Sequence, residues 1–284
     1  MSGFLGGGVG YRHRLRAQLL DDGPGPRPAV LEVMPDHFFS APAAVEPLAD
    51  RYPIVLHDVG LSLGTLPDAA TAALEERRLE RVLEVVRRAR PRLLSDHLAL
   101  TRSPAGVDLG HLLPLRYTRA MLDHLAGRVD RLQHRAGMPV LLENIAAPFV
   151  LCGDYDEADF LGRLAARTGC GVLLDLSNLV VNARNGEFAA GRRLLDYPLS
   201  AVMQVHLAGA RTDPTDPRRL IDSHDGPVAE DSFALLPVLR GRAPLRAIIV
   251  ERDDRLPPLA ELCAEAARAA ALYLGDRPDP EAAA

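Results

Sequence analysis

Short apolar runs that alternate with amphipathic stretches constrain most strongly how this 284-residue chain can fold. Runs this short and this apolar are typical of strands buried on both faces, and we expect eight of them. Parallel neighbours need a crossover connection, which the amphipathic stretches can supply as helices. The expected strands are 5–10, 29–34, 53–57, 92–97, 138–144, 171–176, 201–207 and 245–251, and the expected helices include 68–90, 117–136, 156–168, 230–240 and 258–274.

Eight strands alternating with helices predict a single (β/α)8 TIM barrel, an α/β fold that one chain of this length commonly builds. An open, doubly wound sheet is the alternative. The opening "GGGVGYRHR" does not satisfy G-x-G-x-x-G, so the dinucleotide fingerprint of such a sheet is missing. We expect residues 1–275 to form the catalytic barrel domain and the tail 276–284, "DRPDPEAAA", to be disordered.

Charge and cysteine usage exclude several classes of protein. The formal charge of −5 argues against nucleic acid as a partner, because phosphate binding needs a basic surface. Three widely spaced cysteines form no disulfide framework, and no signal peptide or membrane-length apolar stretch is visible. We therefore expect a cytoplasmic protein that does not act at a membrane.

Histidine or a carboxylate ends six of the apolar runs. In a barrel, the carboxyl ends of the strands meet at one rim, where the βα loops begin and where chemistry takes place. The loop after the seventh strand adds "LIDSHDGP", in which two more such residues stand two apart and would face one way if the stretch is extended. The full set is His57, His97, Glu143, Asp175, His206, Asp222, His224 and Glu251.

These eight side chains predict a metal site at the rim. Taken alone, any one of them is more often a hydrogen-bonded structural group. Together, four carboxylates would repel one another unless cations lay between them, and imidazoles with carboxylates bind first-row transition metals. Eight ligands exceed the needs of one ion and indicate two or three. Asn178 and Asp58 are candidates for a further ligand or for orienting one, while Glu32, His37 and His13 are candidates for contacting the substrate.

Seven ordered motifs carry a resemblance to a known family. They are "HDVGLSLG", "SDHLA", "LLENI", "LLDLSNLVVNA", "QVHLAG", "LIDSHDGPV" and "VERDD", and they extend from about Gly8 to the final helix. The chain resembles the multinuclear non-heme iron-dependent oxidative enzymes, formerly the domain-of-unknown-function 692 family. That resemblance implies a TIM barrel with two or three iron ions held by the eight residues above. It also implies a dioxygen-dependent change to a residue of a ribosomally made precursor peptide, either a cysteine or an acidic or C-terminal residue.

The resemblance further implies a separate partner protein, because members of the family commonly work with one. Some positions depart from the family pattern. Asp58 stands where many members have glycine, Ala210 follows "HLAG" in place of histidine, and His37 lies in "DHFF". Asn178 stands where some members have a histidine that serves a third iron.

Two other functions stay open on the residues alone. The same ligands on the same barrel would also suit a redox-neutral hydrolase or isomerase that uses zinc or manganese. The chain could also be a metal-binding partner protein without catalysis, in which case the ligands would saturate the ions and leave no open position.

Overall fold

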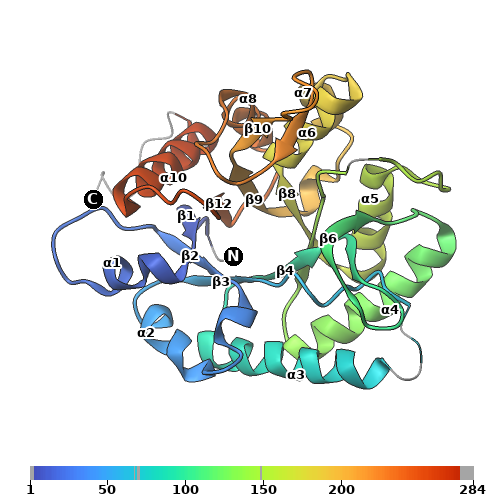
Figure 1. Ribbon diagram of the computed structural model, residues 1–284, viewed down its shortest axis with the longest axis horizontal. Helices are drawn as coiled ribbons and strands as arrows, with labels where there is room; N and C mark the ends of the chain where they lie inside the picture. Colours follow the sequence, from blue (N-terminus) through green and yellow to red (C-terminus); the bar gives the residue numbers. More distant parts are fainter. Residues whose placement is uncertain (1–2, 67, 69–70, 148, 276–284) are drawn as a thin grey trace.

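A closed barrel of eight parallel strands forms the centre of the computed structural model, which describes residues 3–66, 68, 71–147 and 149–275. The strands follow one another around the barrel in the order β1-β2-β3-β4-β7-β8-β9-β12, and β12 closes on β1. Figure 1 shows the larger helices arranged around the outside of this barrel. The predicted TIM barrel is therefore confirmed, and the open sheet is excluded.

All eight barrel strands begin and end within two residues of the predicted bounds. They are β1 Gly7–Gly10, β2 Val30–Val33, β3 Ile54–His57, β4 Leu94–His97, β7 Val140–Glu143, β8 Gly171–Asp175, β9 Val202–Ala208 and β12 Ala247–Glu251. Two antiparallel hairpins lie outside the barrel: β5 Ala99–Arg102 with β6 Asp108–Pro114, and β10 Ala210–Thr212 with β11 Leu220–Asp222.

The helices fill the connections between these strands. They are α1 Arg16–Leu20, α2 Glu46–Ala49, α3 Ala72–Ala89, α4 Arg119–Ala136, α5 Glu157–Thr168, α6 Leu176–Gly186, α7 Ala190–Leu194, α8 Glu230–Phe233, α9 Leu236–Leu239 and α10 Leu259–Leu274. Short 3-10 turns cover His13–Leu15, Pro35–Phe38, Pro42–Val45 and Leu199–Ala201. None of the helices in the described part of the chain is long and apolar enough to cross a bilayer.

Three features differ from the expected elements. The single helix expected over 230–240 is two short helices, because the ring of Pro237 would clash with the carbonyl of Phe233, where α8 ends. Helix α6 starts directly after β8 and was not expected, since its β-branched and asparagine residues are weak helix formers. Neither hairpin was expected. The domain boundary at 275 stays a prediction, and the tail 276–284 lies outside the described residues.

The barrel interior is a closed apolar cluster directly below the strand ends. Successive side chains of a strand point to opposite faces, so a residue two positions before an inward-facing one also points inward. The buried cluster consists of Val30, Val55, Leu93, Leu141, Leu173, Ala247 and Ile249. Five of them stand two positions before a polar rim residue, namely Glu32, His57, Glu143, Asp175 or Glu251. Apolar side chains therefore fill the barrel interior below the rim, and the polar rim side chains lie together in the layer directly above them.

Leu173→Ala should destabilise the metal-free protein by about 2–5 kcal/mol, because Leu173 is fully buried and the barrel cannot collapse around the cavity left behind. Urea unfolding followed by circular dichroism measures this loss. The matched control is Leu195→Ala, at a leucine that is 52% exposed, which should change the stability by less than about 0.5 kcal/mol. Equal effects of the two substitutions would contradict the packed interior.

Candidate metal centre

The strand ends bring the predicted side chains to one rim of the barrel, as expected. Cross-strand register makes His97 the neighbour of Glu143 and Asp175 the neighbour of His206, so each pair faces the same way. Three groups of buried side chains have ligand atoms within 4.8 Å of one another. They are Glu32 with His57 and His206; His57 with His97 and Glu143; and Glu143 with Asp175, His206 and Glu251.

Glu143 occupies the middle of this centre, and its two oxygens face different neighbours. Oε2 lies 3.3 Å from His57 Nε2 and 3.2 Å from His97 Nε2. Oε1 lies 3.1 Å from His206 Nδ1, which is itself 3.1 Å from Glu251 Oε2. Glu143 would therefore contribute one oxygen to each of two neighbouring groups of candidate ligands.

His57 and His206 are oriented through their second ring nitrogens. His57 Nδ1 lies 2.8 Å from Ser95 Oγ, and the Ser95 hydroxyl donates to the Leu56 carbonyl at 3.3 Å. Ser95 therefore accepts the Nδ1–H, which leaves His57 Nε2 free to bind an ion. His206 Nε2 lies 2.8 Å from Glu32 Oε2, and its Nδ1 faces Glu143 and Glu251.

Glu32 therefore belongs to the centre itself. The sequence suggested that it contacts the substrate, and in the structure its partners are His206 and the Gln204 amide, which donates at 2.6 Å. It can fix the ring of His206 or serve as a ligand beside it.

Asp222 and His224 extend the centre from the β10–β11 hairpin. His224 Nε2 lies 2.9 Å from Asp222 Oδ1, and His224 Nδ1 lies 3.7 Å from Glu251 Oε2. The stretch is not extended through His224, whose φ is +48°, so the expected reason for their proximity was wrong. Backbone hydrogen bonds of His224 to Gly209 and Asp253 hold this turn against the rim.

Asp253 supports His224 from the loop after β12, and sequence reasoning missed it. Its Oδ2 lies 3.3 Å from His224 Nδ1, and its Oδ1 accepts from the Arg12 guanidinium Nε at 3.1 Å. A carboxylate on the second nitrogen of a ligand histidine fixes the ring and raises its basicity.

Asp253→Asn should weaken the binding of one ion by roughly 10- to 100-fold, because the amide removes the charge that supports His224. A cobalt(II) titration under argon, followed by visible absorption, measures this affinity. Asp22→Asn is the matched control, since Asp22 forms an ion pair with Arg51 and is 89% exposed there. Identical titrations for the two variants would show that Asp253 does not act on the ion.

Charge in the centre is strongly perturbed. Burial raises the pKa of the Glu143 carboxyl, but His206, His97 and His57 outweigh it and hold that pKa at about 2. Burial lowers the pKa of His224, but Asp222, Asp253 and Glu251 raise it to about 12. Burial, together with Glu143 and Asp222, raises the pKa of Asp175 well above its usual value. Protons on histidines therefore offset the carboxylates, and divalent cations could take their place.

Unsatisfied atoms in the centre fit metal ions. Buried polar groups normally have hydrogen-bond partners, so orphaned atoms that point into one space need an explanation. Within the described residues, several atoms make no hydrogen bond of good geometry, although some lie within 3.3 Å of another atom of the centre: Glu143 Oε2, Asp175 Oδ2, Asp222 Oδ1, Asn178 Oδ1, His97 Nδ1, His206 Nδ1 and both nitrogens of His224. Imidazole and carboxylate donors in this number suit first-row transition metals.

Asp175 has two roles, because it is both a rim residue and the N-cap of α6. Its Oδ1 accepts the backbone N–H of Asn178 at 2.7 Å, while its Oδ2 has no hydrogen-bond partner. Asn178 also donates its amide to the Asn144 carbonyl at 3.1 Å, which leaves Asn178 Oδ1 free.

The remaining candidates lie beside the centre. Asp58 is buried but accepts from Arg78 at 2.9 Å and from the Gly60 backbone, so its carboxylate is already occupied. His13 and His37 stack with ring centroids 5.1 Å apart on the loops after β1 and β2, and Tyr11 holds His13 at 3.1 Å. Their contact with substrate stays a prediction.

A signal for two missed residues was present in the sequence. Ser95 and Gln204 each stand two positions before a rim histidine, where most other strands carry an aliphatic residue. A polar side chain at such an inward-facing position indicates a partner for the histidine above it. Gln204 contacts the histidine two positions along its own strand, His206, whereas Ser95 contacts His57 on the neighbouring strand β3.

Comparisons with known proteins agree with the motifs. A family model described as "RiPP precursor modification enzyme MbnB/TglH/ChrH" matches residues 6–273. A UPF0276 protein of Caulobacter vibrioides is 40% identical over 246 residues, which cover 85% of this chain and 86% of that protein. A UPF0276 protein of Bordetella parapertussis is 42% identical over 227 residues, which cover 79% and 76% of the two chains.

Solved structures share the barrel at low identity. The IolI protein, whose crystal structure has a bound zinc atom, has a TM-score of 0.58 at 12% identity and covers 93% of each chain. An L-ribulose 3-epimerase has a TM-score of 0.54 at 16% identity, covering 94% of this chain and 90% of its own. These similarities support the fold alone.

Proposed function

Because this chain belongs to the family of RiPP precursor modification enzymes MbnB/TglH/ChrH, we propose that it is an iron-dependent oxidase that modifies a precursor peptide. Two or three iron ions would be the cofactor and dioxygen the co-substrate. The modified residue would be a cysteine or an acidic or C-terminal residue. We place the reaction in the cytoplasm and expect a separate recognition protein to assist it.

The two-sided contact of Glu143 carries this proposal. His57, His97 and Glu143 form a set of two histidines and one carboxylate, the ligand type that non-heme iron(II) oxygenases use with positions left open. The other oxygen of Glu143 meets His206, beside Glu251 and Asp175. Two adjoining ligand sets that share one carboxylate favour a multinuclear centre over a single ion.

Iron held by these residues would supply the redox chemistry with dioxygen as the oxidant. The protein residues do the rest. Ser95 and Glu32 hold the rings of His57 and His206, and the apolar cluster beneath keeps the floor of the centre dry. The β10–β11 hairpin positions Asp222 and His224 at the side of the centre.

An oxygen-electrode experiment tests the proposal. The protein is purified under argon, loaded with iron(II), and mixed with synthetic cysteine-containing peptides encoded next to its gene. We expect oxygen consumption that depends on the peptide and a matching change in the mass of the peptide. Iron-loaded protein that consumes no oxygen with any of these peptides would contradict the proposal.

A redox-neutral isomerase or hydrolase is the second candidate, favoured by a ligand set that would equally suit zinc or manganese. A D-psicose 3-epimerase and an L-ribulose 3-epimerase share the barrel. This function would give turnover under argon with zinc bound. The same assay run with and without oxygen therefore separates the two candidates.

A further inference from the structure

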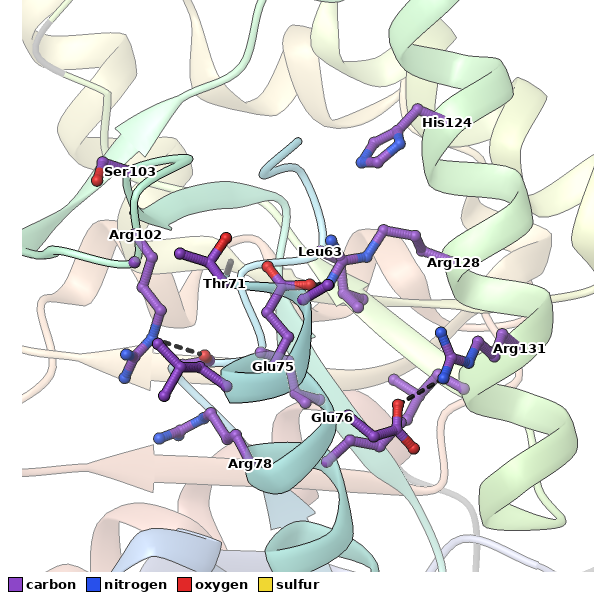
Figure 2. Close-up of a pocket in the computed structure, with 17 residues that line it drawn as sticks. Leu63, Thr71, Glu75, Glu76, Arg78, Arg102, Ser103, His124, Arg128 and Arg131 are labelled. Carbon is purple, nitrogen blue, oxygen red and sulfur yellow. Dashed lines mark hydrogen bonds and ion pairs between the residues drawn. The ribbon is translucent and has the colours of Figure 1, made fainter. Parts of the chain in front are cut away.

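Two hollows beside the rim share three lining residues and together form a groove. One, of about 290 Å³, lies between α3 and α4 (Figure 2), and the other, of about 300 Å³, lies at the rim beside Asp36 and His111. Gly60, Arg78 and Arg102 line both hollows. We call the joined space the Arg102 groove. It begins at Val59 and Gly60, within three residues of His57 at the metal centre.

The α3–α4 end of this groove is apolar. Its walls include Leu61, Leu63, Leu74, Leu79 and Leu132. Leu74 is nevertheless 49% exposed, and Leu66 and Val107, nearby in sequence to lining residues, are 59% and 62% exposed. An exposed leucine that lines a hollow, as Leu74 does, marks a surface that another apolar group can cover.

Most of the charges lining the groove are already paired. Glu75 binds Arg128 at 2.9 Å, and Glu76 binds Arg131 at 2.5 Å. Arg78 binds the buried carboxylate of Asp58 at 2.9 Å. Within each pair the two charges neutralise each other, and the paired side chains form part of the groove wall.

Arg102 is the most loosely paired of these charges, and it lines both hollows. Its Nε donates to the Gly60 carbonyl at 3.3 Å, and its Nη2 forms only a long ion pair with Asp108 Oδ2 at 3.7 Å, which is too long for a hydrogen bond. Figure 2 shows Arg102 on the side of the hollow opposite Arg128 and Arg131 of α4. Within the described residues its terminal nitrogens make no side-chain hydrogen bond, so they can bind an incoming carboxylate, which a guanidinium can hold with two parallel hydrogen bonds.

We propose that the Arg102 groove binds the segment of the precursor peptide next to the modified residue. An aspartate or glutamate of the peptide binds Arg102, and an apolar side chain of the peptide enters the α3–α4 hollow. This assignment rests on the proposed function, because it places the substrate of that same centre. It identifies the substrate as a peptide with an acidic residue and an apolar residue close to the site of modification.

Arg102→Glu tests the assignment through binding and kinetics. The probe is the synthetic cysteine-containing peptide encoded next to the gene, labelled with fluorescein, and its anisotropy is measured with metal-free protein under argon. We expect the Kd to rise roughly 10- to 100-fold, because a charge-assisted contact is lost and a like charge is added. In the oxygen assay, KM should rise by a similar factor while kcat and iron content stay unchanged.

Arg51→Glu is the matched control, since Arg51 precedes β3 at the opposite end of the barrel and pairs there with Asp22. Leu74→Ser, at an exposed position, should also raise the Kd and tests the apolar half of the groove independently. Replacing the acidic residue of the peptide by lysine should restore binding to Arg102→Glu protein.

Equal peptide binding by the Arg102→Glu, Leu74→Ser and Arg51→Glu proteins would overturn the assignment. So would a variant that binds the peptide normally but loses a separate protein partner, because the groove would then be a protein interface. If the peptide binds wild-type protein through Arg102 but is never oxidised, the proposed oxidase function is wrong, whereas the assignment of the groove as a peptide-binding site is supported.

Discussion

Glu143→Gln protein should retain less than one iron per chain where the wild-type protein retains at least two, and its peptide oxidation should fall more than 100-fold. The amide has nearly the shape of the carboxylate but carries no charge and cannot bridge two ions. Loss of a supporting hydrogen bond alone costs roughly 10- to 100-fold in metal affinity or activity, so loss of a shared ligand should cost more. Elemental analysis of protein loaded under argon gives the iron content, and the oxygen electrode gives the rate.

Glu157→Gln provides the control at a half-buried glutamate outside the centre. Its carboxylate accepts from the hydroxyls of Tyr117 at 3.1 Å and Tyr197 at 2.5 Å, and it is in none of the three ligand groups. This variant should keep its iron. A Glu143→Gln protein with two irons and full activity would show that the carboxylate does not join two ions.

Removal of the metal should lower the free energy of unfolding by about 4 kcal/mol for each ion whose free concentration was held near 1,000 times its Kd. The proposed ligands come from strands β3, β4, β7, β8, β9 and β12 and from the β10–β11 hairpin, so only the folded chain can bring them together. Urea unfolding under argon, with and without a chelator, measures the difference.

The Glu143→Gln protein should show a much smaller difference in the same experiment, because it holds less metal from the start. If the wild-type protein unfolds at the same urea concentration with and without chelator, then the buried carboxylates do not depend on cations for their stability.

The barrel was predictable from sequence because buried parallel strands leave a simple pattern. Each run is apolar on both faces, so its bounds are visible, and all eight strands came within two residues. Short helices were harder to predict from the sequence. The break at Pro237 could have been expected from the missing N–H, but α6 depends on the cap that Asp175 provides, which only the fold reveals.

The rim residues were predictable for the same reason, since a polar residue at the end of a buried strand stands out. Residues outside this pattern were not. Glu32 lies one residue before the end of β2, and its contact with His206 spans 174 positions of the sequence. Asp253 lies past the end of β12 and meets His224 only because that residue adopts a left-handed backbone conformation.

The double duty of Asp175 limits how this chain can evolve. A serine, threonine or asparagine in its place would still cap the following helix but would offer no negative charge to an ion. A glutamate would keep the charge, but its longer side chain is poorly suited to capping a helix. A lineage that changes its metal or its reaction can vary the hairpin residues and the groove, whereas a change at this aspartate would disturb a helix and a proposed metal ligand in one step.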